Sequence, residues 1–141
     1  MRASAFVVGV IGLAVLALTG WPGPCEAGGL EDRRDAYNAH DPDAFASAHA
    51  PDVRLYDLGG ELYLHGRDAL RDRYALVFAN APNIRVTIEK RIVVGNYVID
   101  EERISGTESG RIAHAAVIYE VIDGLICRVW VTREPSVAAS G

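Results

Sequence analysis

The second half of the chain alternates between strand-like runs and two-residue turns, and this pattern limits the folds it can adopt. Four runs rich in β-branched and aromatic residues occupy positions 84–94, 97–105, 111–122 and 125–132. Turn dipeptides such as Gly95-Asn96 and Asp123-Gly124 separate them, and these dipeptides suit tight connections between antiparallel strands. The pattern therefore predicts a meander of antiparallel strands.

The first half of the chain mixes helical and strand-like segments. Residues 30–40 place Leu30, Arg33 and Tyr37 on one helical stripe. Asp41-Pro42 then supplies an N-cap and a proline for a second helix over 44–50. A third helix is predicted over 68–80, and shorter strands over 53–58 and 61–65. This order favours an α+β fold whose helices gather on one face of an antiparallel sheet.

The N-terminal segment differs in composition from the rest of the chain. Arg2 is followed by an apolar and small-residue run of about 14 residues, which is short for a membrane span, and then by Cys25-Glu26-Ala27. We interpret residues 1–27 as a cleaved signal peptide, 28–134 as the folded domain and 135–141 as a disordered tail. The protein is then secreted or periplasmic, without stable membrane insertion. A membrane anchor and a lipoprotein attached through Cys25 are the alternatives.

Composition argues against several classes of partner and cofactor. The 141 residues carry a net charge of −5, and no basic patch suits the phosphates of a nucleic acid. No His or Cys spacing is typical of a metal site, and no glycine-rich loop would hold a nucleotide or flavin. We therefore expect no metal, no cofactor and no nucleic-acid partner.

Asp57 is the acidic residue that invites a functional interpretation. Strand alternation places it on the same face as Val53 and Leu55, which are apolar. At the strand end, such an aspartate can bind water or a turn amide. In an apolar pocket, desolvation would instead raise its pKa and make it a usable base. The residues alone leave both interpretations open.

Four segments of the mature chain resemble a known superfamily in their order and spacing: residues 37–44, 50–53, 66–70 and 119–124. They are similar to the SnoaL-like and ketosteroid-isomerase-like branch of the nuclear-transport-factor-2-like superfamily. The resemblance covers essentially the whole mature chain. It implies an α+β cone, in which a curved antiparallel or mixed sheet with about three helices on its concave side encloses a ligand-sized pocket.

The same resemblance implies roles for individual residues. Asp57 falls where the ketosteroid isomerases have their proton-shuttling aspartate, and Tyr74 where they have an aromatic pocket residue. Those enzymes also use an oxyanion hole made of a tyrosine and a protonated acid. Arg33 falls at the position of that tyrosine and Val117 at or near that of the acid, so this chain does not reproduce the oxyanion hole.

The charged run from Asp100 to Arg103 must present one of two faces to the pocket. Alternation pairs Glu101 with Arg103 on one side, and Asp100 with Glu102 on the other. A solvated strand with cross-strand ion pairs is one interpretation. The resemblance favours another, in which Arg103 enters the pocket and holds a carboxylate, phenolate or enolate oxygen.

These observations predict an exported pocket protein that binds a small apolar or carbonyl-containing molecule. Asp57 is the candidate base for proton transfer, and an enzyme of this kind would be an isomerase, cyclase or dehydratase-like lyase. The candidate substrate-binding residues are Tyr37, Tyr74, Arg103, Val117 and Val129. A non-catalytic ligand-binding or dimerisation module is the alternative. We also expect a homodimer built on the outer sheet face, which bears residues such as Trp130.

Overall fold

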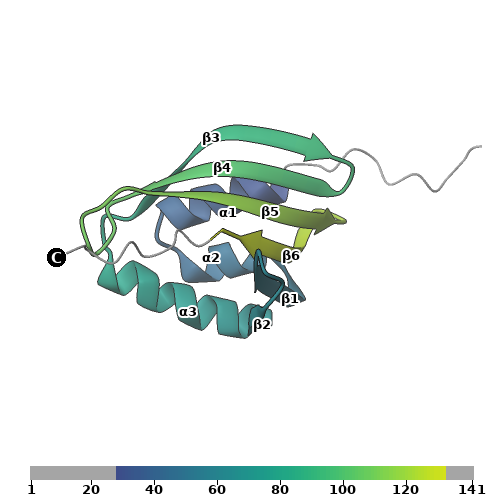
Figure 1. The fold of residues 1–141 in the computed structure, drawn as a ribbon. Helices are drawn as coiled ribbons and strands as arrows, with labels where there is room; N and C mark the ends of the chain where they lie inside the picture. Colours follow the sequence, from purple (N-terminus) through teal and green to yellow (C-terminus); the bar gives the residue numbers. More distant parts are fainter. Residues whose placement is uncertain (1–27, 133–141) are drawn as a thin grey trace, which may run out of the picture.

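The computed structural model describes residues 28–132, which form three helices and six strands (Figure 1). The predicted leader, the tail and the cleavage site therefore lie outside the described residues. The helices are α1 (Gly28–Asn38), α2 (Pro42–Ser47) and α3 (Arg67–Asn80). The strands are β1 (His49–Asp57), β2 (Leu62–His65), β3 (Arg85–Val94), β4 (Tyr97–Ser105), β5 (Ala113–Ile122) and β6 (Leu125–Val131).

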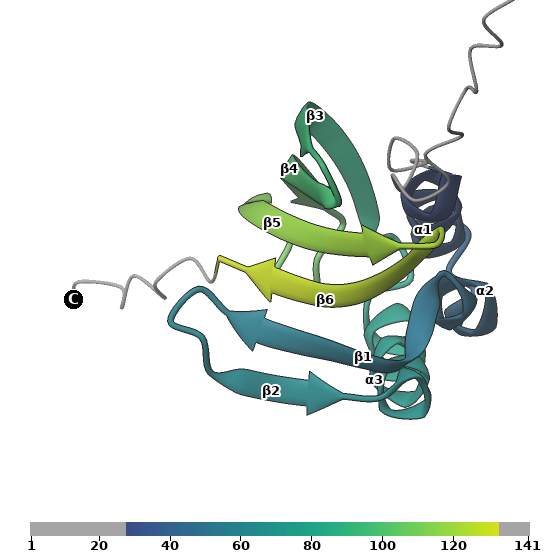
Figure 2. The same cartoon turned by 90° about the vertical axis from the view of Figure 1, so that its right-hand side faces the viewer.

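The six strands form one curved, mixed sheet in the order β2-β1-β6-β5-β4-β3. Neighbouring strands run antiparallel except β1 and β6, which are parallel. Figure 2 shows the three helices gathered on one side of the sheet, while the other side carries no helix. The predicted α+β cone is confirmed.

Local sequence signals account for the ends of several elements. Asp41 caps α2, since its side chain accepts a hydrogen bond from the amide of Ala44 at 3.0 Å, and Pro42 follows at the first helical position. Asp123 and Gly124 both have positive φ angles, 52° and 76°. This is the conformation that a two-residue type I′ hairpin needs, and it joins β5 to β6.

The second helix is shorter than the sequence predicts. It ends at Ser47, and β1 already begins at His49. Pro51 favours an extended conformation for the residue before it, which works against continuing the helix to Ala50. Pro51 also lacks an N–H, but it lies where the pairing of β1 with β6 is interrupted, between His49 and Arg54.

Side chains at the end of α1 bind the free edge of the sheet. Asn38 donates from Nδ2 to the carbonyl oxygen of Val86 at 3.0 Å and accepts from the Val86 amide at 2.8 Å. His40 Nε2 lies 2.7 Å from the carbonyl oxygen of Ile84. These contacts fix the C-terminal end of α1 against β3.

The two faces of the sheet differ in what they bury. The inner face packs against the helices and contains Val53, Val98 and Ile126, all fully buried. On the outer face, Tyr56 of β1 and Trp130 of β6 stack with ring centroids 5.7 Å apart, and the ring of Tyr97 lies 6.4 Å from that of Trp130.

Within residues 28–132, no helix is long and apolar enough to cross a membrane.

Candidate functional site

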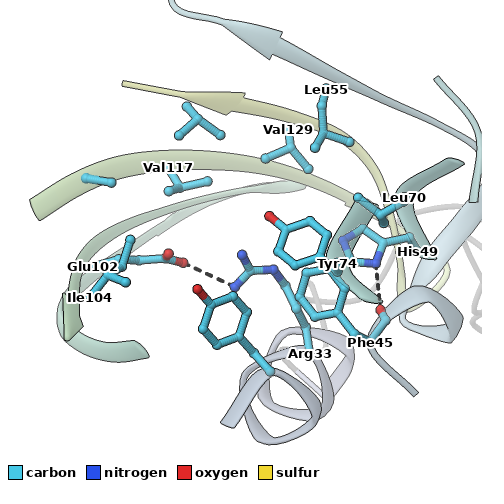
Figure 3. Close-up of a pocket in the computed structure, with 13 residues that line it drawn as sticks. Arg33, Phe45, His49, Leu55, Leu70, Tyr74, Glu102, Ile104, Val117 and Val129 are labelled. Carbon is cyan, nitrogen blue, oxygen red and sulfur yellow. Dashed lines mark hydrogen bonds and ion pairs between the residues drawn. The ribbon is translucent and has the colours of Figure 1, made fainter. Parts of the chain in front are cut away.

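A pocket of about 90 Å³ lies between the helices and the inner face of the sheet (Figure 3). Its polar or aromatic lining residues are Arg33, Tyr37, Phe45, His49, Tyr74 and Glu102. The apolar remainder of the lining comprises Leu55, Leu70, Ile104, Ala115, Val117, Val129 and Val131. Polar groups therefore come mainly from the helical side and from β4, and the other strands provide an apolar wall.

Arg33 is the charged donor of this pocket. Helical spacing from Leu30 turns it toward the sheet, and it is only 7 % exposed. Its guanidinium carbon lies 5.2 Å from the ring centroid of Phe45 and 4.9 Å from that of Tyr119. Burial opposes its charge, but Tyr119 and Glu102 outweigh this effect and raise the pKa of Arg33 above its ordinary value.

Glu102 neutralises Arg33 with a single contact. Its Oε1 accepts from Arg33 Nη1 at 3.2 Å and from the hydroxyl of Tyr119 at 2.5 Å. Arg33 Nε and Nη2 have no hydrogen-bond partner among the described residues. Because a guanidinium has five N–H groups, most of the donor capacity of Arg33 remains available to a ligand.

Aromatic rings surround the guanidinium on the helical side. Tyr37 contacts Phe45, Tyr74 and Phe78 with centroid distances of 5.9, 6.0 and 5.4 Å, and Phe45 lies 4.2 Å from Tyr74. Burial raises the pKa of both Tyr37 and Tyr74. Their phenols therefore stay protonated and can donate hydrogen bonds.

His49 contributes a neutral imidazole. Its side chain lies at the start of β1 and is 1 % exposed. Nδ1 is 2.9 Å from the carbonyl oxygen of Phe45, which requires the proton on Nδ1 (Figure 3). Burial, and next the charge of Arg33, lower the pKa of His49 to about 3. The imidazole is therefore uncharged at neutral pH.

Four of the predicted ligand-binding residues meet in this pocket. Tyr37 and Tyr74 line it from α1 and α3, and Val117 and Val129 line it from β5 and β6. Arg103 does not reach it. Val98, Asp100 and Glu102 are the buried residues of β4, so alternation turns Arg103 to the opposite face of the sheet.

Asp57 also lies outside the pocket lining. Its Oδ1 accepts a hydrogen bond from the amide of Glu61 at 2.9 Å, and its backbone pairs with Glu61 and Gly60 in the β1–β2 turn. This is the turn-binding arrangement that the residues left open. In the parallel ladder, Asp57 nevertheless lies opposite Val131, which lines the pocket.

Neither His49 nor Glu102 is among the pocket residues predicted from the sequence. His49 was placed within the second helix, although the extended conformation expected before Pro51 indicated that the strand begins early. Glu102 was one of two equivalent choices on β4. Glu102 faces the pocket where the buried Arg33 of α1 lies opposite it. The alternation of residues within one strand gives no information about such a distant partner.

The pocket offers no cluster typical of a metal site. Within residues 28–132, no group of three His, Cys, Asp or Glu side chains is placed to hold a metal ion. The available chemistry is that of a cationic donor, phenolic hydroxyls, a carboxylate and a neutral imidazole. Such groups bind polar atoms of an organic molecule whose apolar part contacts the wall.

A curved mixed sheet that carries three helices over an internal pocket defines the class of cone-shaped nuclear-transport-factor-2-like proteins. The chain belongs to the SnoaL-like domain family, whose sequence profile matches residues 30–129. A comparison with curated protein sequences finds no match.

Solved structures with the same fold are similar over most of the chain. A cystatin-fold protein from Novosphingobium aromaticivorans is 23 % identical with a TM-score of 0.68, and the match covers 74 % of this chain and 95 % of that one. A protein with a ketosteroid isomerase-like fold from Catenulispora acidiphila, in complex with trimethylamine, is 21 % identical with a TM-score of 0.67 and coverages of 77 % and 86 %. A SnoaL-like protein from Burkholderia thailandensis is 19 % identical, with a TM-score of 0.61 and coverages of 77 % and 96 %.

Proposed function

We propose that the protein binds a small organic molecule through a carbonyl or carboxylate oxygen that accepts hydrogen bonds from Arg33. One observation carries this proposal: the guanidinium of Arg33 lines the pocket, but only its Nη1 makes a hydrogen bond to a described residue. A ligand oxygen in the pocket can accept hydrogen bonds from the guanidinium nitrogens that no described residue binds. The hydroxyls of Tyr37 and Tyr74 supply further donors on the same side.

The size of the pocket restricts the ligand. The pocket volume is about 90 Å³. It is well below the roughly 300 Å³ at which pockets for drug-sized ligands begin. A compact molecule of about four to six non-hydrogen atoms suits this volume, whereas a steroid does not. The similar structure from Catenulispora acidiphila is in complex with trimethylamine, which is equally small, but the free N–H donors of Arg33 favour an acceptor oxygen over an ammonium group.

Binding can be tested with acetate, propionate and acetone as probes and trimethylammonium as a cationic control. Titrations followed by amide chemical shifts should show the oxygen-bearing probes entering the pocket and the cation staying out. Arg33→Met should weaken their binding about tenfold or more, as expected for losing a charge-assisted hydrogen bond. Arg34→Met is the matched control, because Arg34 lies on the same helix and pairs with Glu31 and Asp35 at the surface.

Three results would contradict the proposal. The first is preferential binding of trimethylammonium, and the second is unchanged probe affinity in Arg33→Met. Equal losses in Arg33→Met and Arg34→Met would point to a general effect on α1 instead of a ligand contact, and would also count against it.

A second candidate function is proton transfer next to a ligand carbonyl. It is favoured by membership in the SnoaL-like family and by the position of Asp57 opposite Val131, which lines the pocket. In this scheme Arg33 holds the enolate oxygen while Asp57 takes the proton. Proton–deuterium exchange into small ketones should then fall by about two orders of magnitude in Asp57→Asn. No exchange by the wild-type protein leaves ligand binding as the function.

The predicted homodimer stays a proposal about the outer sheet face. Tyr56 and Trp130 stack there, and no helix covers this face within residues 28–132. Trp130→Glu should dissociate such a dimer in analytical ultracentrifugation. A wild-type mass equal to one chain at micromolar concentration would exclude it.

Export also stays a proposal. Cleavage of the leader after Ala27 should give an N-terminus at or within a few residues of Gly28. Intact mass measured from the native host checks this. Retention of Met1 in a membrane fraction would contradict it, and a lipid mass on Cys25 would identify a lipoprotein.

A further inference from the structure

His49 is a second polar group in the pocket lining: it offers a hydrogen-bond acceptor, whereas Arg33 offers donors. Its Nδ1 proton is committed to the carbonyl oxygen of Phe45 at 2.9 Å. Nε2 therefore carries a lone pair and can only accept a hydrogen bond. No described residue donates to Nε2, and the ring lines the pocket (Figure 3).

The ring stays neutral near neutral pH, so Nε2 keeps its acceptor character there. The ring is 1 % exposed, and the nearby charge of Arg33 further opposes a second proton. Arg67 adds to this opposition from the other side of the backbone, where Nε binds the carbonyl oxygen of His49 at 2.8 Å. Because the pKa of His49 is lowered to about 3, a ligand meets the neutral ring at any pH near neutrality.

Arg33 and His49 both line the pocket, and both lie close to the ring of Phe45. The guanidinium carbon of Arg33 lies 5.2 Å from the Phe45 centroid, and the His49 ring centroid lies 5.1 Å from it. A pocket of about 90 Å³ that contacts both residues allows one compact molecule to reach both.

We propose that the pocket selects small molecules that combine an acceptor oxygen with a hydroxyl donor, such as short hydroxy acids and hydroxy ketones. The carboxylate or carbonyl oxygen binds Arg33, and the hydroxyl donates to His49 Nε2. This inference rests on the proposed function of the pocket and specifies its substrate class. A ligand without the hydroxyl leaves that acceptor unsatisfied, which should weaken binding about tenfold or more.

Matched probe pairs test this selection in the wild-type protein. Lactate is compared with propionate, and hydroxyacetone with acetone, in titrations followed by amide chemical shifts. Each hydroxylated probe should bind about tenfold or more tightly than its partner. Equal affinities within both pairs would overturn the inference while leaving the proposed function intact. Failure of all four probes to bind would overturn both.

A variant and a spectroscopic readout assign the effect to His49. His49→Asn retains a donor for the Phe45 carbonyl but has no acceptor at the position of Nε2, so it should bind both members of a pair with similar affinity. Persistence of the wild-type preference in this variant would overturn the inference. The ¹⁵N resonance of Nε2 needs no variant: it should shift with lactate and much less with propionate, and equal shifts would contradict the assignment.

Discussion

Two ion-pair clusters join helix α1 to the inner face of the sheet at β4, and they differ in how many nitrogens of the arginine are bound. At one, Arg91 binds both carboxylate oxygens of Asp100, at 2.7 and 2.8 Å, and also Glu31 at 2.6 Å. At the other, two residues along β4, Arg33 makes one 3.2 Å contact with Glu102. The first guanidinium uses three of its nitrogens, whereas the second uses one.

The two guanidiniums therefore differ in the donors that they leave free. The saturated cluster fixes α1 on the sheet, and all three nitrogens of Arg91 are bound by carboxylates. The guanidinium of Arg33 lines the pocket with nitrogens that no described residue binds, and the proposed function assigns these donors to a ligand.

Breaking the saturated cluster should have the largest effect on stability. Asp100→Asn removes a 1 % exposed carboxylate and leaves Arg91 without its main counter-charge. We expect a loss of about 3 to 5 kcal/mol in the free energy of unfolding, measured by urea denaturation. Probe affinity at the pocket should be unchanged under conditions where the variant is folded. Equal weakening of binding by Asp100→Asn and Arg33→Met would show that the two clusters do not differ in function.

Acid should destabilise the protein through His49. In the folded state its pKa is lowered to about 3, and in the unfolded chain it is about 6.5. The unfolded state thus binds more protons between these values, so the stability present above pH 6.5 is lost as the pH falls toward 3. The histidine contributes about 3 kcal/mol of this loss between pH 7 and pH 4.

His49→Asn isolates that contribution, because carboxylates titrate in both proteins. Its free energy of unfolding should depend less on pH than that of the wild type. Arg33→Met should reduce the slope as well, since the charge of Arg33 helps to lower the pKa of His49. Parallel pH profiles for wild type and His49→Asn would contradict a buried neutral histidine.

A double-mutant cycle measures the unsaturated pair itself. Arg33→Met should cost about 2 kcal/mol, because Glu102 loses its counter-charge but keeps the hydrogen bond from Tyr119. Adding Glu102→Gln removes the unpaired charge and should recover part of that stability without restoring probe binding. Recovery of binding in the double variant would show that Arg33 does not contact the ligand.

Asp57 gives the smallest expected effect. Asp57→Ala removes the acceptor for the Glu61 amide and should cost about 1 kcal/mol in thermal or urea unfolding. Asp57→Asn keeps an acceptor oxygen and should cost less. A larger loss in the Asn variant than in the Ala variant would contradict the turn-binding role.

Local signals in the sequence were sufficient for most of the fold. Asp41-Pro42 marks the start of α2, and Asp123-Gly124 marks a hairpin, because both are set by the conformations that a few adjacent residues prefer. The stripe of Leu30, Arg33 and Tyr37 predicted the first helix, and all three side chains are buried in the structure.

The candidate site was less accessible to sequence reasoning. Tyr37 and Tyr74 were identified, but the strand pattern could not decide between Arg103 and Glu102 as the pocket residue. That choice depends on α1, some 70 positions away, which places a buried cation opposite β4. The role of His49 depends on a strand beginning that was assigned to a helix. The pocket residues were therefore hard to predict because they depend on contacts between distant segments and on where each element begins.

The amide of Asn38 has a consequence for association between molecules. β3 is the last strand of the sheet, and the N–H and carbonyl of Val86 on its free edge are taken by this one side chain. Bare strand edges are templates on which a second polypeptide can add and seed cross-β polymers. Asn38 takes the hydrogen-bonding positions of such an incoming strand at Val86, so the side chain that holds α1 against β3 also blocks strand addition at this point of the edge.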